Sequence, residues 1–250
     1  MTLQPNTIEN QLIDELCHYI ADGRVPSEFE VARLKREASK IKGGNHASYA
    51  CILGMIACLD NDVEECKKQH ELAIRLESSA SNYDAYCTSL YNIGCIFESY
   101  QWAEKGLTRF PYAPQLLEKA IKAAYFLCLF DKVVEHYQSL IPLQLPMVDR
   151  ETQGFFENAE VVLSLGIPID SLHMLSNILE SIRLKHHFDI RTLDLSLIDT
   201  EETQELFSWI GTSSNVDATI EMNMELCEML ACQPNIDLGN MTVAFRACQN

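Results

Sequence analysis

The sequence of 250 residues predicts a mainly α-helical protein, with antiparallel helix pairs stacked as a solenoid and a small α+β cap at the C-terminal end. Three observations lead to this fold class. Apolar residues recur with helical spacing from the start to about residue 185. Short polar turns separate the helical stretches, which favours antiparallel neighbours. The spacing changes to alternation near residue 186, which is typical of a strand.

The first two helical stretches carry recognisable start or stop signals. The stretch 7–23 has apolar residues at helical spacing and ends at Gly23, a residue type that commonly terminates helices. The stretch 26–44 opens with Ser27 and Glu30, whose spacing is that of a capping box. We therefore expect these stretches to form the first helix pair.

The helical spacing continues through four further pairs. Each pair consists of two amphipathic stretches joined by a few polar residues, so its helices should lie antiparallel. The predicted helices are 46–61 and 62–78, 82–99 and 100–110, 113–130 and 131–141, and 149–166 and 167–185.

The C-terminal part mixes strands with helices. Residues 188–199 alternate apolar and polar side chains and predict a strand. Residues 199–211 are predicted as a helix, because Asp199 and Glu202 have capping-box spacing. A further helix is expected over 216–233, and a short strand over 241–247 that pairs with the first strand.

The composition limits the classes of partner. The net charge of −17 argues against nucleic-acid binding and against docking on anionic lipid. No apolar run approaches the roughly 20 residues that span a bilayer, and the start of the chain lacks a basic signal-peptide region. The sequence thus predicts a cytoplasmic protein with no membrane or nucleic-acid partner. After Arg191 the only basic residue is Arg246, so the acidic tail favours a basic protein partner.

The ten cysteines are scattered, and none stands in a CxxC motif. Cys51 and Cys58 fall in one helical stretch, Cys87 and Cys95 in another, and Cys128 has apolar neighbours. Free cysteine behaves as a small buried apolar side chain in a reducing compartment. We therefore expect most of these thiols to pack in the core.

The stretch CLDNDVEECKKQH concentrates carboxylates, thiols and a histidine. Its acids match several positions of a calcium loop, but Glu65 stands where that loop requires glycine. Cys66 and His70 are one helical turn apart, and two ligands are too few for a structural zinc site. We interpret the stretch as a turn between helices with Asn61 or Asp62 as the N-cap, and we predict no metal and no cofactor.

Small residues recur at related positions of the helix pairs. Gly54, preceded by leucine, lies in the first helix of one pair, and Cys66 and Ala73 follow in the second helix. Gly94, preceded by isoleucine, repeats the start of this pattern in the next pair and is followed by Gly106. Such residues allow paired helices to approach closely, and helix pairs that recur in this way are typical of helical repeats.

These residues resemble the pattern of the tetratricopeptide repeat family. Tyr125, Val134 and Pro146 continue the resemblance in the fourth pair. The resemblance covers about residues 8–185 and is clearest over 47–146. It implies a solenoid whose concave face is lined by the first helix of each pair.

Members of that family bind a protein or peptide on the concave face. The resemblance therefore implies a partner-binding groove. Carboxylate-clamp members place lysine and asparagine at inward positions, whereas this chain has cysteine, methionine and tyrosine there, so capture of a free C-terminal carboxylate is not expected. The implied groove residues are Cys51, Met55, Tyr91, Asn92, Cys95 and Glu98.

The sequence as a whole predicts a repeat array over 1–185 and a small α+β domain over 186–250. It favours a non-catalytic interaction module that acts as an adaptor, a chaperone or an antitoxin-like neutralising subunit, and it leaves a homo-oligomer open. One alternative is a peptide-sensing regulator whose C-terminal part oligomerises or contacts an effector. Another is an enzyme with a site near His186 and His187, although such a pair more simply ends a helix.

Overall fold

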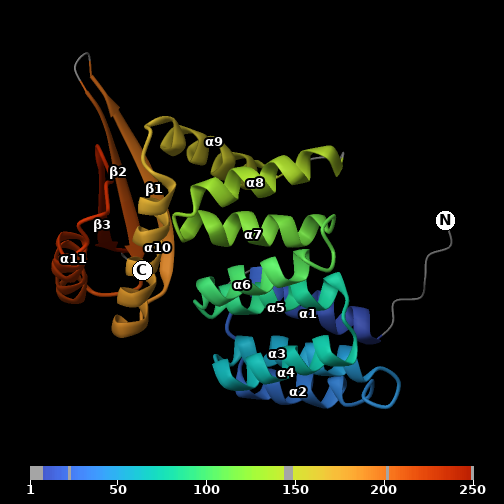
Figure 1. Cartoon of the computed structure of the whole chain (residues 1–250). Coiled ribbons are helices and arrows are strands. Elements are labelled where there is room, and N and C mark those ends of the chain that lie inside the picture. The colour runs from blue at the N-terminus through green and yellow to red at the C-terminus, as the bar shows by residue number, and fades with distance from the viewer. Residues whose placement is uncertain (1–7, 22–23, 144–148, 201–202, 249–250) are drawn as a thin grey trace. The chain divides into compact units, whose positions relative to one another are not determined.

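The computed structural model describes residues 8–21, 24–143, 149–200 and 203–248. These residues form eleven α-helices, one short 3-10 helix and a three-stranded sheet near the C-terminus (Figure 1). The predicted fold class is confirmed, since helix pairs are followed by an α+β part. None of the helices in these ranges is long and apolar enough to cross a membrane. Three residues used as signals in the sequence analysis lie outside the described residues: Gly23, Pro146 and Glu202.

The chain divides into two compact units, residues 1–116 and residues 117–250. The boundary lies within one helix, α7 (Pro114–Phe126). The sheet and the last four helices therefore belong to the same unit. The change from helix to strand after residue 186 occurs within this second unit, and a separate domain over 186–250 stays a prediction.

Within the described residues, the first unit holds six complete helices, and most begin at a capping side chain. Ser27, Asn45, Asp62 and Ser79 each accept a hydrogen bond from a backbone N–H of the next helix. Ser27 and Glu30 form the predicted capping box. The helices are α1 (Ile8–Ala21), α2 (Glu28–Ala38), α3 (His46–Leu59), α4 (Val63–Leu76), α5 (Ala80–Asn92) and α6 (Ile96–Leu107).

The third helix pair breaks earlier than predicted. A helix over 82–99 followed by one over 100–110 is wrong, because α5 ends at Asn92 and α6 begins at Ile96. Gly94 lies between the two helices with a φ of 76°, a left-handed conformation that ends a helix. The glycine that we expected inside a helix therefore terminates one.

The turns inside three helix pairs share one geometry. In each turn the N–H that follows a left-handed residue donates to the carbonyl five positions earlier, at 2.8–2.9 Å, which is a Schellman arrangement. The left-handed residues are Asn61, Gly94 and Cys128. These three positions are almost equally spaced along the chain. The interval from Gly54 to Gly94 is longer because Gly54 lies inside a helix and Gly94 lies in a turn, so the helix pairs recur more regularly than these two glycines suggest.

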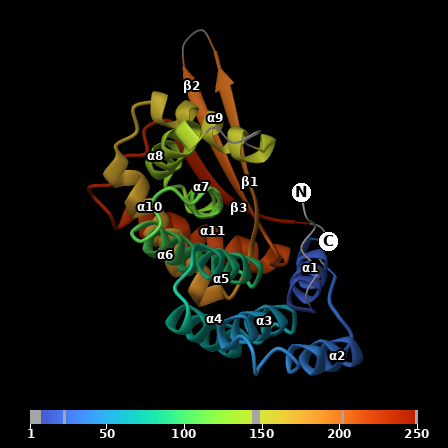
Figure 2. The same ribbon diagram turned by 90° about the vertical axis from the view of Figure 1, so that its right-hand side faces the viewer.

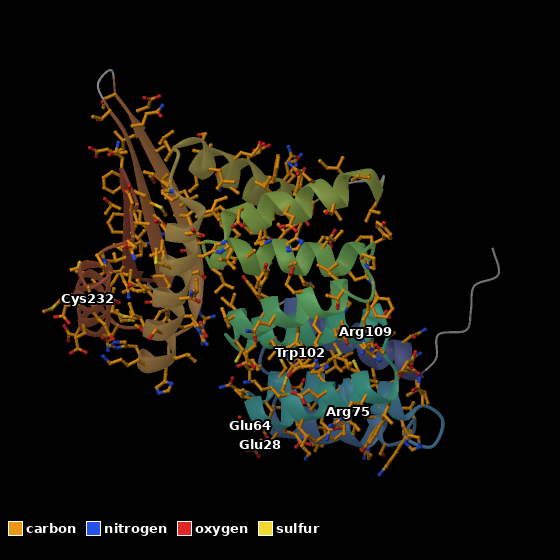
Figure 3. The ribbon with its side chains drawn as sticks, in the orientation of Figure 1. Glu28, Glu64, Arg75, Trp102, Arg109 and Cys232 are labelled. Atoms are coloured by element: carbon orange, nitrogen blue, oxygen red, sulfur yellow. The ribbon has the colours of Figure 1, made fainter. Side chains whose placement is uncertain are left out.

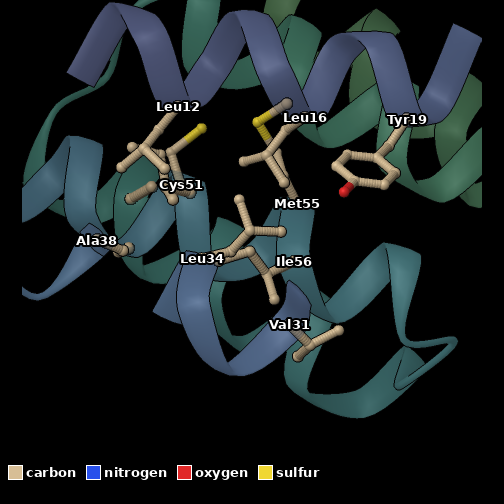
Figure 4. Packing of buried hydrophobic residues seen from close by; sticks show 12 residues of the cluster. Leu12, Leu16, Tyr19, Val31, Leu34, Ala38, Cys51, Met55 and Ile56 are labelled. Atoms are coloured by element: carbon tan, nitrogen blue, oxygen red, sulfur yellow. The ribbon is translucent and has the colours of Figure 1, made fainter. Parts of the chain in front are cut away.

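A core of the first unit lies where α1, α2 and α3 meet (Figure 4). Leu12 and Leu16 on α1 point toward Cys51 and Met55 on α3, and all four side chains are buried. Leu34 on α2 closes the cluster from another side. One face of α3 is therefore covered by α1.

The second unit begins with helices that pack through aromatic rings. Tyr125 stacks on Phe155 with ring centroids 4.4 Å apart, and Tyr137 stacks on Phe156 at 4.1 Å. The Tyr125 hydroxyl also accepts a hydrogen bond from the Asn158 amide at 2.9 Å. After α7, the helices are α8 (Phe130–Leu140), the 3-10 helix η1 (Ile141–Leu143), α9 (Arg150–Ser164), α10 (Ile169–His186) and α11 (Val216–Ala231).

The sheet differs from its prediction in the middle strand. The helix predicted over 199–211 is wrong, because its second half forms a strand that pairs antiparallel with the first strand in a hairpin (Figure 2). Leu206 and Ile210 face the buried side of this strand, while Trp209 is exposed. The last strand pairs parallel with the middle one and not with the first. The strands are β1 (Ile190–Asp199), β2 (Gln204–Thr212) and β3 (Met241–Ala247).

Candidate functional site

The first two residues of the predicted groove are buried. Cys51 and Met55 are 6% and 5% exposed, because α1 packs over them (Figure 4). Burial raises the pKa of the Cys51 thiol to about 12. A side chain covered by a neighbouring helix cannot meet a partner, so this pair belongs to the core.

The other four predicted groove residues lie on both sides of a helix break. Tyr91 and Asn92 end α5, Cys95 is the N-cap of α6, and Glu98 lies in the first turn of α6. The Glu98 carboxylate accepts a hydrogen bond from Lys67 Nζ at 2.8 Å. Positions that sequence reasoning placed on one helix therefore do not share one helical face.

His70 and Cys66, which were considered as a metal-binding pair, are both fully buried. His70 Nε2 lies 2.9 Å from Ser89 Oγ, and the His70 ring stacks on Tyr86 with centroids 5.1 Å apart. Burial lowers the pKa of His70 to about 3 and raises the pKa of the Cys66 thiol. Both side chains are therefore neutral at pH 7 and act as packing groups.

The acids of the same stretch begin a helix, as predicted. Asp62 caps α4, since its Oδ1 accepts a hydrogen bond from the Glu65 N–H at 3.0 Å. The carboxylates of the first turn lie near the positive end of the helix dipole. Among the residues that the structure describes, no group of three His, Cys, Asp or Glu side chains is placed to hold a metal ion.

The predicted helix end at His186 and His187 is confirmed. His186 is the last residue of α10, and His187 follows with a left-handed φ of 51°. His186 Nε2 and Lys185 Nζ each lie 2.8 Å from Glu225 Oε2, and the two groups hold the pKa of that carboxyl below its usual range. These contacts tie the end of α10 to α11.

A pocket that sequence reasoning missed lies among α4, α5 and α6. Figure 3 labels three of its lining residues, Arg75, Trp102 and Arg109. Its volume is about 360 Å³. The lining contains three basic side chains, one carboxylate and an indole. The residues of this basic pocket that matter for its chemistry are Glu71, Arg75, Ser78, Trp102, Lys105 and Arg109.

Neutral groups position two of the basic side chains. Lys105 Nζ lies 3.8 Å from the centroid of the Trp102 ring, a cation–π contact. Arg109 Nη1 donates a hydrogen bond to Ser78 Oγ at 2.8 Å. Arg75 is exposed, and within the described part of the chain it has neither a hydrogen-bond nor an ion-pair partner. Only the helical spacing of Lys105 and Arg109 was visible in the sequence.

A second feature lies on α11, where apolar side chains recur every three or four residues on the exposed face. Val216, Ile220 and Met224 are 64%, 54% and 61% exposed, and Cys227 is exposed beside them. The last three residues also line a shallow cavity of about 460 Å³. We call these four residues the α11 stripe.

Comparisons of the chain with protein-family models, with curated proteins and with solved structures gave no match.

Proposed function

We propose that this chain is a non-catalytic protein-interaction module built from helix pairs. The regular turns at 61, 94 and 128 support the tetratricopeptide-like character that the sequence suggests. The ten cysteines are free thiols, which suits the reducing cytoplasm, and we place the protein there. An adaptor, a chaperone and a neutralising subunit all need an exposed surface that binds another protein.

The observation that carries this proposal is the α11 stripe. Contiguous apolar side chains on a surface mark sites of protein interaction. The opposite face of α11 is fixed in the core by Met222 and Leu226, which are almost fully buried. Asn223 also exchanges two hydrogen bonds with the backbone of Phe245, at 2.9 and 2.8 Å. The stripe is therefore presented on a firmly held helix.

Charge around the stripe indicates the kind of partner. Asp217, Glu221 and Glu228 each follow a stripe residue by one position, so they line one edge of the stripe. Helix α11 has no basic residue. A second copy of this helix would double the negative charge around the contact, whereas a cationic amphipathic helix would place its basic groups on these acids.

The stripe also bears on the alternative function. It lies in the C-terminal α+β part, which the sequence analysis assigned to oligomerisation or effector contact in a peptide-sensing regulator. The same surface would serve that role. In both cases we commit to a cationic amphipathic segment of a partner protein as the occupant.

Binding of a designed helix tests this surface. The probe is a fluorescein-labelled peptide of about 18 leucine and lysine residues with all leucines on one face. We expect fluorescence anisotropy to show saturable binding that Ile220→Gln with Met224→Gln weakens by about tenfold or more, roughly 1.4 kcal/mol. Val25→Gln with Phe29→Gln is the matched control, because both side chains are exposed and apolar but lie in the first unit.

Two further measurements test whether charge attraction alone explains the binding and whether a second copy of the chain occupies the stripe. A scrambled peptide of the same composition should bind at least about tenfold more weakly, because it lacks an apolar face. Unchanged binding by the α11 double variant would contradict the proposal. A dimer in sedimentation analysis that Ile220→Gln with Met224→Gln dissociates would show that a second copy, and not a cationic helix, occupies the stripe.

A further inference from the structure

The basic pocket holds positive charge that the surrounding acidic chain does not neutralise. Three basic side chains, Arg75, Lys105 and Arg109, line it together with one carboxylate, Glu71. In the described residues none of the three basic groups forms an ion pair with a carboxylate. The chain has 36 acidic and 19 basic residues, so unpaired basic groups gathered in one place are unexpected.

Most of the other basic residues that the structure describes pair with carboxylates. Arg183 Nε donates to Glu180 Oε2 at 2.6 Å, and Lys67 Nζ donates to Glu98 Oε1 at 2.8 Å. Such pairs neutralise each cation within the protein. The basic pocket departs from this pattern, because its charge remains available to a ligand.

The pocket is also organised before any ligand arrives. Trp102 packs against Tyr86 with ring centroids 4.8 Å apart and against Tyr83 at 6.0 Å. The indole therefore has a fixed position, and it holds Lys105 through the cation–π contact. Ser78 in turn holds Arg109. Less side-chain entropy is lost on binding when the cations are already in place.

We propose that the basic pocket binds a phosphomonoester dianion. Arginine guanidinium groups match the geometry of phosphate oxygens and donate two hydrogen bonds in parallel. Three basic groups against Glu71 leave an excess of two positive charges, which balances the charge of about −1.5 to −2 on a phosphomonoester at pH 7. A carboxylate would neutralise only half of that excess.

The size of the pocket limits the ligand. About 360 Å³ is near the lower end of ligand sites, which span roughly 300–1,000 Å³. A phosphoryl group on a short stem fits this volume, and the stem is either a phosphorylated side chain of a protein or a free small phosphoester. The pocket lies in the first unit and the α11 stripe in the second, so this inference does not depend on the proposed function.

Trp102 fluorescence provides a local test. The two tryptophans of the chain are Trp102 and Trp209, so Trp209→Phe leaves one reporter in the pocket. The probe is N-acetyl-phosphoserine-N-methylamide, compared with its unphosphorylated parent. We expect a saturable change with the phosphorylated compound alone, because a phosphate bound by Lys105 changes the charge beside the indole.

Two double variants that remove the same charge distinguish binding in the pocket from attraction to the overall charge of the protein. In the Trp209→Phe background, Arg75→Gln with Arg109→Gln should weaken phosphoserine binding by about tenfold or more. Arg36→Gln with Lys40→Gln removes the same charge from exposed positions outside the pocket, and we expect a change of less than about twofold. Arg75 has no hydrogen-bond or ion-pair partner among the described residues, so Arg75→Gln alone should weaken binding and leave the unfolding transition in urea unchanged.

A peptide distinguishes the two sources of phosphate. If a short alanine–glycine peptide with one phosphoserine binds more tightly than the amide, the ligand is a phosphorylated protein segment. Equal affinities assign the pocket to a small phosphoester. An equal response to the unphosphorylated parent, no saturable response at all, or equal losses in the two charge-matched variants would overturn the proposal.

Discussion

The imidazole of His70 lies directly over Gly54, so these two residues depend on each other. A Cβ atom on Gly54 would lie 2.5 Å from His70 Cδ2, far inside normal contact distance. Tyr86 stacks against the His70 ring, and Ser89 contacts its Nε2, so the ring has no room to retreat. The glycine that resembles a repeat position is therefore required by one neighbouring side chain.

His70 should also make stability depend on pH. The buried ring has a pKa of about 3, below the ordinary value of about 6.5, so only the unfolded chain is protonated between these pH values. The contribution of His70 to the free energy of unfolding is therefore fully present above about pH 6.5. It falls by about 1.4 kcal/mol per pH unit below that value, until the ring of the folded protein is protonated near pH 3. We expect His70→Phe to reduce this loss, as measured by urea unfolding at pH 7.5 and pH 5.

An exposed histidine provides the control for this measurement. His18 lies at the surface of α1, so His18→Gln serves as the comparison for removal of a histidine that is not buried. Carboxylates contribute equally to all three proteins and cancel in the comparison. The same loss of stability in the His70→Phe variant as in the wild type would contradict the role of His70.

At the scale of elements, short local signals set most helix ends. Ser27, Asn45 and Asp62 begin their helices through side-chain caps, and the left-handed residue Asn61 follows the end of α3. Such signals involve neighbours in sequence, which is why the predicted start of α2 is confirmed. They fail where one residue type serves two purposes, as Gly94 does, because glycine is found both at close helix contacts and at helix ends.

Two glycines near α9 should respond in opposite directions to the same substitution. Neither Gly154 nor Gly166 has a heavy atom within 4 Å of an added Cβ, so only the backbone conformation decides the effect. Gly154→Ala, inside the helix, should stabilise by about 1 kcal/mol. Gly166→Ala should destabilise by about 1 kcal/mol, because its φ is 74°.

Urea unfolding followed by circular dichroism measures both effects. The pair needs no further control, since each variant adds one methyl group to the same helix region. Shifts of the same sign would show that solvent exposure, and not backbone conformation, governs these positions.

At the scale of the whole molecule, buried thiols are distributed over both compact units. Cys51, Cys58, Cys66 and Cys87 are buried in the first unit and Cys128 in the second, so half of the ten cysteines are buried where the sequence analysis expected most of them to be. Burial raises the pKa of Cys58 to about 11 and that of Cys128 to about 12. Exposed thiols also occur in both units, so thiol reactivity reports on the entire fold.

Thiol labelling of the native protein should therefore show a fast group of three. Cys17, Cys227 and Cys232 are exposed and should react with an aromatic disulfide reagent in the native protein. The five buried thiols should react only after unfolding in urea. Replacing Cys17 and Cys232 by serine should remove two thiols from the fast group. Rapid reaction of Cys51 or Cys128 in native protein would contradict the described packing.

The error at β2 shows why local signals do not suffice for the sheet. Residues 199–211 contain a capping-box spacing, yet β1 needs a hydrogen-bonding partner and the adjacent segment supplies it. Leu206 and Ile210 alternate with exposed positions, which was the available signal for a strand. The choice between helix and strand was made by pairing and not by local preference.

The candidate sites show the same limit. The exposed face of α11 could be read from the helical spacing of Val216, Ile220 and Met224, but the sequence does not say which apolar face of a helix is buried. The basic pocket could not be read at all, because Arg75 and Lys105 are far apart in the sequence. Packing of α4, α5 and α6 brings the two together, and packing of α1 on α3 buries the predicted groove residues Cys51 and Met55.

The sequence by itself determined the mainly helical class, most helix ranges, the outer strands and the excess of acid, because these depend on period, caps and composition. Only the tertiary structure decided which turns repeat, which faces are covered and where unpaired cations gather. The physical reason is that burial and charge pairing depend on contacts between residues far apart in the chain. For this protein the search for function therefore moves from the face of α3 to the α11 stripe and the basic pocket.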